Sequence, residues 1–373
     1  MKIECFKNKL QKAVNITERI TAKNLSLPIL KNILLEAENG FLYIKATNLE
    51  VGIETKIPAK IHQAGKITIN PSVFSKFLSN LKEEDKITLT IENNNLNVST
   101  TNSNTVIKSE STEDFPTIPK ISSKDKLIIK KEDFINGLKS VAFASSVSDI
   151  KPEIASIFIY LKEDYLYFVA TDSFRLAEKK IKINKSSFTE SIILPIKNAL
   201  EIIKVFEGGE EGEELEIFSD GNQISILSSQ THFTSRVING VYPDYKQIMP
   251  QEYKISLNLN KDELLQSLKL NTIFVDRFNQ INFLLNISDK NLILNTPNQD
   301  TGENTTILNN IDLKTKTTDT EFNTCYNIRY IIDVFQNIYS EKIFLGLNET
   351  NKPLMIKNIN DESFSYIVMP VTR

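Results

Sequence analysis

Hydrophobic and polar positions follow two periods along this chain, and the order of the periods repeats three times. Each repeat has a helix-period segment, two apolar strands around a short polar turn, a second helix and further strands. Repeats of this size are whole domains, because solenoid units run about 20–50 residues. The predicted helices cover 6–14, 73–81, 134–142, 196–206, 264–270 and 328–338. The predicted strand pairs are 33–35 with 41–43, 157–159 with 165–167, and 281–283 with 292–294.

The apolar side chains of the predicted helices are spaced for burial on one face. Phe6, Leu10 and Val14 recur every fourth residue in the first helix, and Leu200 and Ile203 share a face of the fourth. Each helix is therefore expected to pack one stripe against a sheet.

The strand segments alternate apolar and polar residues. Segments 66–69, 86–91 and 96–100 have the period of half-buried antiparallel strands, and Asn93-Asn94 is typical of a hairpin turn. The chain is predicted to be α+β, with three similar domains that each pack two helices on antiparallel sheets.

Two proline-containing segments divide the repeats. Segments 116–124 and 242–250 combine proline with polar residues, and proline favours extended backbone around it. We expect both to be extended connectors between domains 1–118, 125–249 and 253–373.

Composition is that of a soluble globular protein that works in a reducing compartment. Hydrophobic residues make up 40% and charged residues 24%. No apolar run reaches the roughly 20 residues of a membrane helix, and the first residues do not resemble a signal peptide. Cys5 and Cys325 are too few for a disulfide framework, so we expect a cytoplasmic protein without a membrane partner.

The residues that usually carry catalysis are sparse. His62 and His232 stand apart from other metal-ligating residues, and no P-loop or zinc motif occurs. The acidic run 207–214 reads as a solvated turn, because clustered carboxylates repel phosphate. We therefore expect no catalytic residue, no metal site and no cofactor, and an enzyme is the weaker hypothesis.

The charge pattern favours diffuse contact with a polyanion. The formal net charge is −3, which argues against a tight, static nucleic-acid complex, although the local sign matters more. Each predicted helix nevertheless carries a basic residue on its polar face, and solvated lysines on helix exteriors are the ordinary alternative. These basic residues are Lys9, Lys12, Lys76, Lys139, Lys197, Lys204, Lys269 and Arg329.

Four segments together resemble a known family. In order along the chain they are Leu27-Pro28-Ile29-Leu30, Ala170-Thr171-Asp172-Ser173-Phe174-Arg175-Leu176-Ala177, Val241-Tyr242-Pro243-Asp244-Tyr245 and Tyr366-Ile367-Val368-Met369-Pro370-Val371. On a threefold repeat of this size, they make the whole chain similar to the bacterial DNA polymerase III beta subunits, the sliding clamps.

The resemblance implies a head-to-tail homodimer closed into a ring. Helices would line the hole, sheets would form the outside, and double-stranded DNA would pass through. The ring would act as a processivity factor that tethers the polymerase without gripping DNA, since a few mobile lysines attract phosphates without fixed registry. The resemblance adds Lys23 and Asn24 to the basic residues above as DNA-facing positions.

The resemblance also implies a pocket that binds short peptides with apolar anchors. Partners would be the replicative polymerase alpha subunit, the clamp loader and, through the same pocket, translesion polymerases, mismatch-repair proteins and ligase. A buried final strand is the alternative for 368–371. The pocket positions are Ile154, Thr171, Ser173, Phe174, Arg175, Leu176, Pro243, Gln247, Ile248, Val368, Met369, Pro370 and Val371.

This chain departs from the family pattern at several positions. Ser173-Phe174 replaces the usual Gly-His, Gln247 stands where a basic residue is frequent, and Thr105 stands where an aromatic residue is favoured. The resemblance places the dimer seam between the edge strand with Thr105, Val106 and Ile107 and the region of Ile273 and Phe274. The competing class is a repeat scaffold that binds no DNA.

Overall fold

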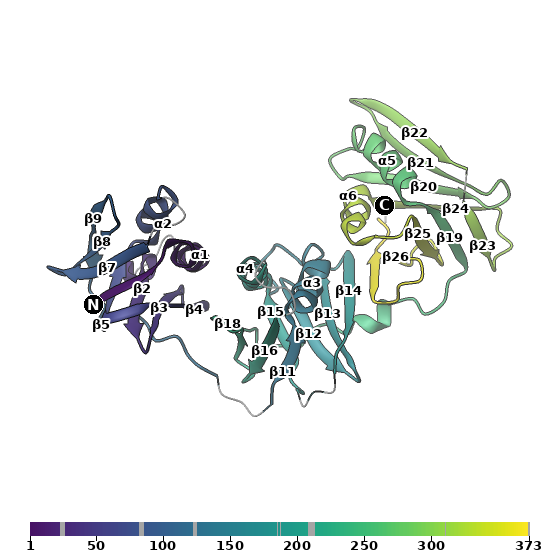
Figure 1. Ribbon diagram of the computed structural model, residues 1–373. Helices are drawn as coiled ribbons and strands as arrows, with labels where there is room; N and C mark the ends of the chain where they lie inside the picture. The colour runs from purple at the N-terminus through teal and green to yellow at the C-terminus, as the bar shows by residue number, and fades with distance from the viewer. Residues whose placement is uncertain are drawn as a thin grey trace. The chain divides into compact units, whose positions relative to one another are not determined.

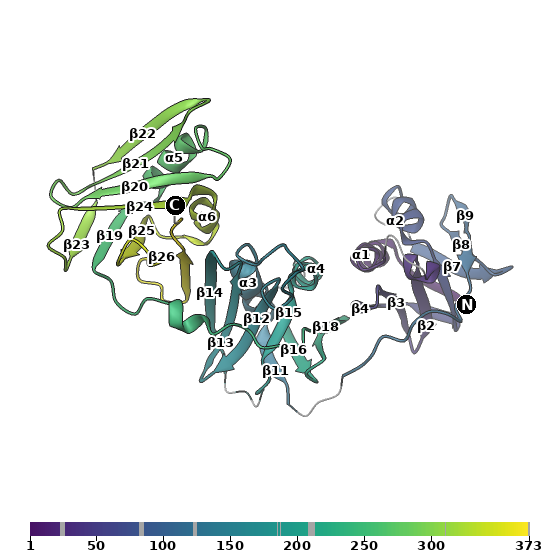
Figure 2. The same cartoon turned by 180° about the vertical axis from the view of Figure 1, so that it is seen from behind.

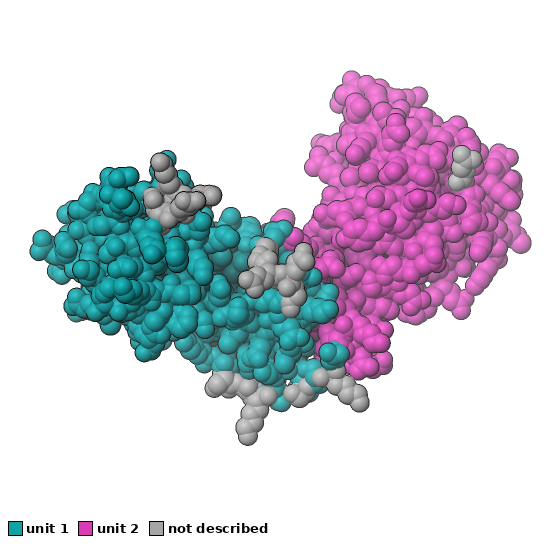
Figure 3. All heavy atoms as spheres, viewed as in Figure 1, with its two compact units in different colours: residues 1–135, 184–239 teal, residues 136–183, 240–373 magenta. Residues whose placement is uncertain are grey.

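The computed structural model describes residues 1–22, 27–81, 86–121, 125–184, 186, 188–207, 213–309 and 311–371. Lys23, Asn24 and most of the acidic run 207–214 lie outside these residues. The chain forms two compact units, Met1–Ile135 with Asn184–Asn239 and Asn136–Ile183 with Gly240–Arg373, which Figure 3 shows in two colours. Each unit is described by itself below.

The threefold order of elements is confirmed. The first repeat has β1 (Lys2–Phe6), α1 (Lys7–Glu18), η1 (Pro28–Lys31), β2 (Ile33–Glu38), β3 (Phe41–Thr47), β4 (Val51–Pro58), β5 (Lys60–Gln63), β6 (Gly65–Ile69), α2 (Pro71–Ser79), β7 (Lys86–Glu92), β8 (Asn95–Ser99), β9 (Asn104–Ile107) and β10 (Ser109–Glu110).

The second repeat has β11 (Leu127–Lys130), α3 (Lys131–Ala142), β12 (Ser156–Lys162), β13 (Tyr165–Thr171), β14 (Arg175–Lys182), β15 (Ile192–Pro195), α4 (Ile196–Phe206), β16 (Glu214–Ser219), β17 (Gln223–Leu227), β18 (Thr231–Arg236) and η2 (Tyr245–Ile248). The third has β19 (Ile255–Asn260), α5 (Lys261–Thr272), β20 (Gln280–Asn286), β21 (Asn291–Asn298), β22 (Gly302–Leu308), β23 (Asp312–Thr315), β24 (Glu321–Asn327), α6 (Ile328–Asp333), η3 (Val334–Asn337), β25 (Lys342–Leu347), β26 (Leu354–Asn358) and β27 (Phe364–Val368).

The sheets of the first unit are antiparallel. One has the strand order β5-β1-β7-β8-β9, and the other has β10-β6-β2-β3-β4-β18-β17-β16-β11. Helices α1 and α2 lie side by side in both ribbon views (Figures 1 and 2), and Ser75 Oγ donates to Asn15 Oδ1 between them at 2.9 Å. The second of these sheets therefore runs without interruption from the first repeat into the second.

The second unit repeats this plan. One sheet contains the order β12-β13-β14-β27-β26-β25-β19-β23, and a second has β22-β21-β20-β24. Its helices α5 and α6 are also neighbours. In both units, the sheet crosses a repeat boundary by antiparallel strand pairing, β4 with β18 and β14 with β27.

The six helices lie where the sequence predicts them, but two of the predicted buried positions are wrong. Phe6 ends β1 and is 56% exposed, because α1 begins one residue later. Leu200 is 41% exposed, because α4 buries the stripe that contains Ala199, Ile203 and Phe206. The sixth helix also ends early, at Asp333, and continues as the 3-10 turn η3.

The hairpin prediction is confirmed and one linker prediction is wrong. Glu92 pairs with Asn95, and Asn93 and Asn94 have φ of 48° and 60°, as a two-residue hairpin turn requires. The linker around 242–250 is not extended throughout, because Tyr245–Ile248 forms the 3-10 turn η2 with Tyr245 buried. Among the described residues, every helix is too short or too polar to cross a bilayer.

Packing between α3 and the sheet depends on a glycine. A methyl group at Gly137 would overlap the ring of Phe168, which is fully buried on β13. Helices normally lose stability at glycine, so its presence here is explained by the close approach of the ring.

We expect Gly137→Ala to lower the free energy of unfolding by about 1–3 kcal/mol, as overpacked cores do. Urea unfolding measures this change. Adding Phe168→Leu should restore part of the loss, because it removes the overlapping ring atoms. A Gly137→Ala protein at least as stable as the unchanged chain would contradict the packing.

Candidate functional site

The turn between β13 and β14 is organised by two side chains. The Thr171 hydroxyl donates to the Arg175 carbonyl at 2.6 Å and accepts from the Ser173 amide at 3.1 Å. Asp172 Oδ1 accepts the amides of Phe174 and Arg175, both at 3.0 Å. Ser173 has a φ of 78°, a conformation that favours glycine. The turn presents Phe174 with 61% of its surface exposed.

The first repeat has the same turn between β3 and β4. Thr47 Oγ1 donates to the Val51 carbonyl at 2.8 Å, and Asn48 Oδ1 accepts the amides of Glu50 and Val51 at 3.0 and 2.9 Å. Leu49 has a φ of 75°, close to that of Ser173. The first and second repeats therefore share the backbone geometry of this turn, whereas the charged residues Asp172 and Arg175 occur only in the turn of the second repeat.

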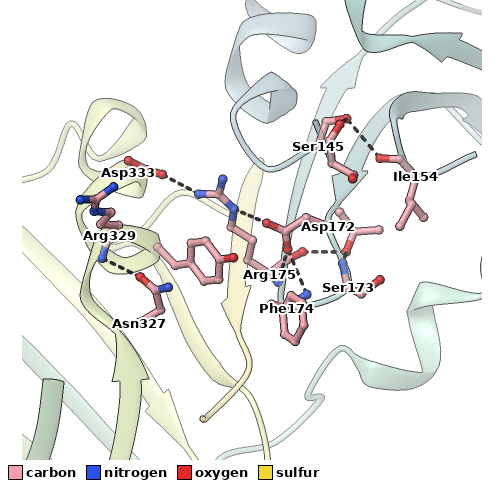
Figure 4. Close-up of polar contacts among 12 residues, drawn as sticks. Ser145, Ile154, Asp172, Ser173, Phe174, Arg175, Asn327, Arg329 and Asp333 are labelled. Atoms are coloured by element: carbon pink, nitrogen blue, oxygen red, sulfur yellow. Dashed lines mark hydrogen bonds and ion pairs between the residues drawn. The ribbon is translucent and has the colours of Figure 1, made fainter. Parts of the chain in front are cut away.

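Arg175 connects this turn to the third repeat. Its Nε donates to Asp172 Oδ2 at 2.9 Å and its Nη1 to Asp333 Oδ2 at 2.5 Å, as Figure 4 shows. The guanidinium lies over the rings of Tyr330, at 4.4 Å from the centroid, and Phe143, at 5.7 Å. A planar, weakly hydrated cation suits such a stacked and half-buried position.

The electrostatics of this cluster keep Arg175 charged. Burial alone lowers the pKa of the guanidinium, but the neighbouring Tyr366 hydroxyl and the two carboxylates raise it overall. Burial also raises the pKa of Tyr366, whose hydroxyl donates to the Tyr330 carbonyl at 2.8 Å. The cluster is thus a fixed positive charge surrounded by neutral aromatic rings and two carboxylates.

The C-terminal segment lies along the same turn. Val368 is the last residue of β27, pairs with Arg175 and is fully buried, so the alternative of a buried strand is correct for this residue. Beyond it, the Met369 amide donates to the Phe174 carbonyl and the Val371 amide to the Cys325 carbonyl, both at 2.8 Å. Met369, Pro370 and Val371 are half-buried.

An aromatic stack fixes the segment before η2. The Tyr242 ring stacks on Phe158 at 4.7 Å, Phe158 on Tyr160 at 5.0 Å, and Tyr160 on Tyr167 at 4.9 Å. The Tyr160 and Tyr245 hydroxyls are 2.7 Å apart. This stack holds the segment that carries three exposed pocket positions, Pro243, Gln247 and Ile248.

A buried carboxylate completes this anchor. The Tyr245 hydroxyl and the Lys246 ammonium, the latter at 2.6 Å, both donate to Glu178 Oε2 on β14. Burial, reinforced by the Glu178 charge, raises the pKa of Tyr245, so its proton stays in place as a donor. Sequence reasoning missed Glu178 and the stack; the alternating aromatic residues at 158, 160, 165 and 167 were the available signal.

The second unit contains all the predicted pocket positions. Thr171 and Leu176 are buried, and Ile154 and Arg175 are half-buried. Ser145 Oγ donates to the Ile154 carbonyl at 3.2 Å, which fixes the loop that carries this residue. Strand pairing brings 171–176 and 368–371 together, and the stack joins 242–248 to the same sheet.

The predicted DNA-facing residues within the described part of the chain are exposed on their helices. Lys9 and Lys12 lie on α1 and Lys76 on the neighbouring α2, whereas Lys204 pairs with Glu201 at 2.8 Å. The others are Lys139 on α3, Lys197 on α4, Lys269 on α5 and Arg329 on α6.

Both histidines have structural contacts. His62 pairs with Glu4 at 2.8 Å, and His232 lies 2.6 Å from Ser225 Oγ on the neighbouring strand. Burial lowers the pKa of His232 and so favours its neutral form. The described residues contain no group of three His, Cys, Asp or Glu side chains placed to hold a metal ion.

The predicted seam residues lie on the edge strand β9 and directly after helix α5. Thr105 and Val106 belong to β9, the last strand of its sheet, and Val106 is 57% exposed, whereas Ile107 is buried. Ile273 follows α5 and is exposed. Strand β22, a second edge that sequence reasoning missed, exposes Ile307.

Three family models match the chain in succession. They describe the DNA polymerase III beta subunit, with the N-terminal domain at residues 1–119, the central domain at 128–244 and the C-terminal domain at 246–372. A beta sliding clamp of Buchnera aphidicola subsp. Rhopalosiphum padi is 29% identical over 357 residues, which cover 95% of each chain.

Solved structures share the fold. The sliding clamp of Pseudomonas aeruginosa superposes with a TM-score of 0.93 at 21% identity over 100% of both chains. The corresponding beta subunit of Thermotoga maritima gives 0.91 at 24% identity over 100% of this chain and 99% of that one. The three-domain α+β prediction is thereby confirmed.

We expect Asp172→Asn to lower the free energy of unfolding by about 1.5–3 kcal/mol, the range for hydrogen bonds to charged groups. The amide oxygen can still hold the turn, as Asn48 does, but its NH₂ group faces the Arg175 Nε–H. The matched control Asn48→Asp should change stability by less than about 0.5 kcal/mol. Equal effects of the two substitutions in urea unfolding would contradict the role of the Arg175 pair.

Proposed function

The chain belongs to the DNA polymerase III beta subunit family, and from this premise we propose how its surfaces work. It is a sliding clamp, a processivity factor for DNA polymerase. We propose that two copies close into a ring around duplex DNA. The helices face the DNA, the sheets form the outside, and the ring slides while it tethers the polymerase.

The observation that carries the sliding proposal is the placement of the basic residues. Exposed lysines on α1 and α2, and one or two exposed basic residues on each of the other helices, occur in a chain with a net charge of −3. Such thinly spread cations attract phosphates at long range, and salt screens that attraction over about 8 Å at physiological ionic strength. This placement supports a ring that keeps DNA bound because it encircles the duplex. The ten DNA-facing positions given above would make only weak contacts with the phosphates.

The peptide pocket is proposed around the Asp172 turn. Exposed Phe174 and Ile248 supply apolar surface on two segments that the Arg175 cluster and the aromatic stack hold in place. A few buried anchors on a firm support suit exchangeable peptides. The thirteen positions predicted from the sequence are proposed to line this pocket, with buried Leu176 and Val368 beneath it.

The further partners follow from the same pocket. We propose that it receives the replicative polymerase alpha subunit, the clamp loader, translesion polymerases, mismatch-repair proteins and ligase, one at a time. The clamp is proposed to be cytoplasmic, non-catalytic and free of cofactors, with domains 1–118, 125–249 and 253–373. Family membership argues against a repeat scaffold that binds no DNA.

The sliding proposal predicts retention by topology. Protein loaded on closed circular DNA should remain bound through gel filtration at moderate salt and should be lost when one restriction cut linearises the circle. A linear DNA blocked at both ends by bound protein is the matched control and should retain the clamp. Equal retention on circular and open linear DNA would refute sliding.

The pocket proposal predicts that deletion of 369–373 abolishes binding of a polymerase-tail peptide while the dimer survives. The deletion removes the amides that bond to Phe174 and Cys325 and the half-buried Met369-Pro370-Val371 surface. The control chain ends at Val371 and should bind normally. Fluorescence anisotropy with labelled peptide measures both, and undiminished affinity after the longer deletion would refute the assignment.

A further inference from the structure

The cation at the Asp172 turn is already engaged within the chain. Arg175 bonds to Asp172 and Asp333, lies over two aromatic rings and exposes 12% of its side chain. Asp333 exposes 43% of its side chain, so this cluster presents a carboxylate to solvent more than it presents the guanidinium (Figure 4). An acidic ligand would have to displace one of the two carboxylates to reach Arg175.

The second cation of the pocket segments, Lys246, makes a contact that both linkers share. Its Nζ lies 2.6 Å from Glu178 Oε2 on β14 and 4.9 Å from the centroids of two tyrosine rings. In the first unit, Lys120 of the other linker pairs in the same way with Glu54 on β4, at 3.3 Å. A lysine–glutamate pair in both places attaches the linker to the sheet, and its charge is compensated there.

Asp244 is the exposed carboxylate of the second linker, and its bonded partner is neutral. Gln247 Nε2 donates to Asp244 Oδ2 at 2.8 Å, and a primary amide leaves the charge of a carboxylate in place. Within the ranges that the structure describes, no lysine or arginine pairs with Asp244. The first linker has Thr117 after Pro116 where the second has Asp244 after Pro243, so this charge is specific to the second linker.

Asp244 lies among the exposed apolar positions of the pocket. Pro243 precedes it, and Ile248, four residues later, is 45% exposed. Tyr242 and Tyr245 on either side of the pair are buried, so the backbone that carries the carboxylate is held in place. A peptide whose apolar anchor packs on Ile248 therefore passes beside a fixed negative charge.

We propose that Asp244 selects peptides that carry a lysine or arginine next to their apolar anchor and rejects those with an acidic residue there. The proposal rests on the peptide pocket proposed above and adds a charge preference to it. The pocket segments offer an uncompensated carboxylate while both of their cations are engaged, and complementary charge gives specificity more than affinity. Repulsion of an acidic neighbour contributes to the discrimination as much as attraction of a basic one.

Gln247 makes this selection possible. A basic side chain at this position would pair with Asp244 across the same turn and neutralise it, whereas the glutamine amide holds the carboxylate without neutralising it. The charge preference is therefore a property of the pair Asp244 and Gln247.

Three labelled peptides test the preference. They share one sequence with aliphatic and aromatic anchors and differ only in the residues that flank the anchors, which are lysine, serine or glutamate. By fluorescence anisotropy at about 50 mM salt, the lysine peptide should bind the full chain about fivefold more tightly than the glutamate peptide, as expected for an exposed ion pair. The ratio should approach one at about 1 M salt, where the screening length is about 3 Å.

Two substitutions locate the charge. Asp244→Asn removes the carboxylate, and Gln247→Arg neutralises it from the neighbouring position, so each should bring the ratio of the two affinities close to one. A purely structural effect of either substitution would weaken all three peptides alike and leave the ratio unchanged. The ratio thus separates charge recognition from damage to the pocket.

Glu362→Gln is the matched control. It makes the same change in net charge at a carboxylate that is 90% exposed and precedes β27, at the opposite end of this strand from the pocket segment 368–371. The fivefold ratio should persist in this variant. Loss of the ratio in Glu362→Gln would mean that net charge alone sets the preference, and the role of Asp244 would be wrong.

The remaining outcomes separate this inference from the pocket itself. Equal affinities for the three peptides, with binding that still requires the anchors, would overturn the charge preference and leave the pocket intact. A lysine preference that survives Asp244→Asn would overturn the assignment to this residue. Failure of all three peptides to bind would overturn the pocket and the preference together.

Discussion

Backbone hydrogen bonding along strand edges is the constraint on which this structure depends. A strand at the edge of a sheet exposes unsatisfied donors and acceptors, and a protein must cover or pair them. This chain pairs them at both repeat boundaries, β4 with β18 and β14 with β27. One kind of contact, antiparallel pairing of strand edges, therefore joins neighbouring repeats in both units.

The candidate site lies where a repeated element acquires different chemistry. The Asn48 and Asp172 turns share their hydrogen bonds and a left-handed residue at the same place. The change from amide to carboxylate adds an acceptor for Arg175, and the guanidinium then reaches Asp333 on α6. A turn that only connects strands in the first repeat thus becomes, in the second, a support held from two repeats.

The sequence was sufficient to predict the elements that are determined by the spacing of hydrophobic and polar residues. Helix positions, the strand pairs and the Asn93-Asn94 turn were predicted, because each is set by local spacing or by φ. The failures involve tertiary context: Phe6 belongs to the strand before its helix, and Leu200 lies beside the buried stripe rather than in it.

The sequence predicted which segments form the candidate site, but it did not predict the side-chain contacts within the site. Motif resemblance identified 171–176, 242–248 and 368–371, which strand pairing and the aromatic stack bring to one sheet. Partners distant in sequence, such as Asp333 for Arg175 and Glu178 for Tyr245, leave no local signal. The sequence also gave no signal that β22 ends its sheet, which the strand order shows.

Electron cryomicroscopy of the purified protein without DNA is the most direct test of the proposed ring. We expect closed rings of two chains. Single chains or open arcs would contradict the ring.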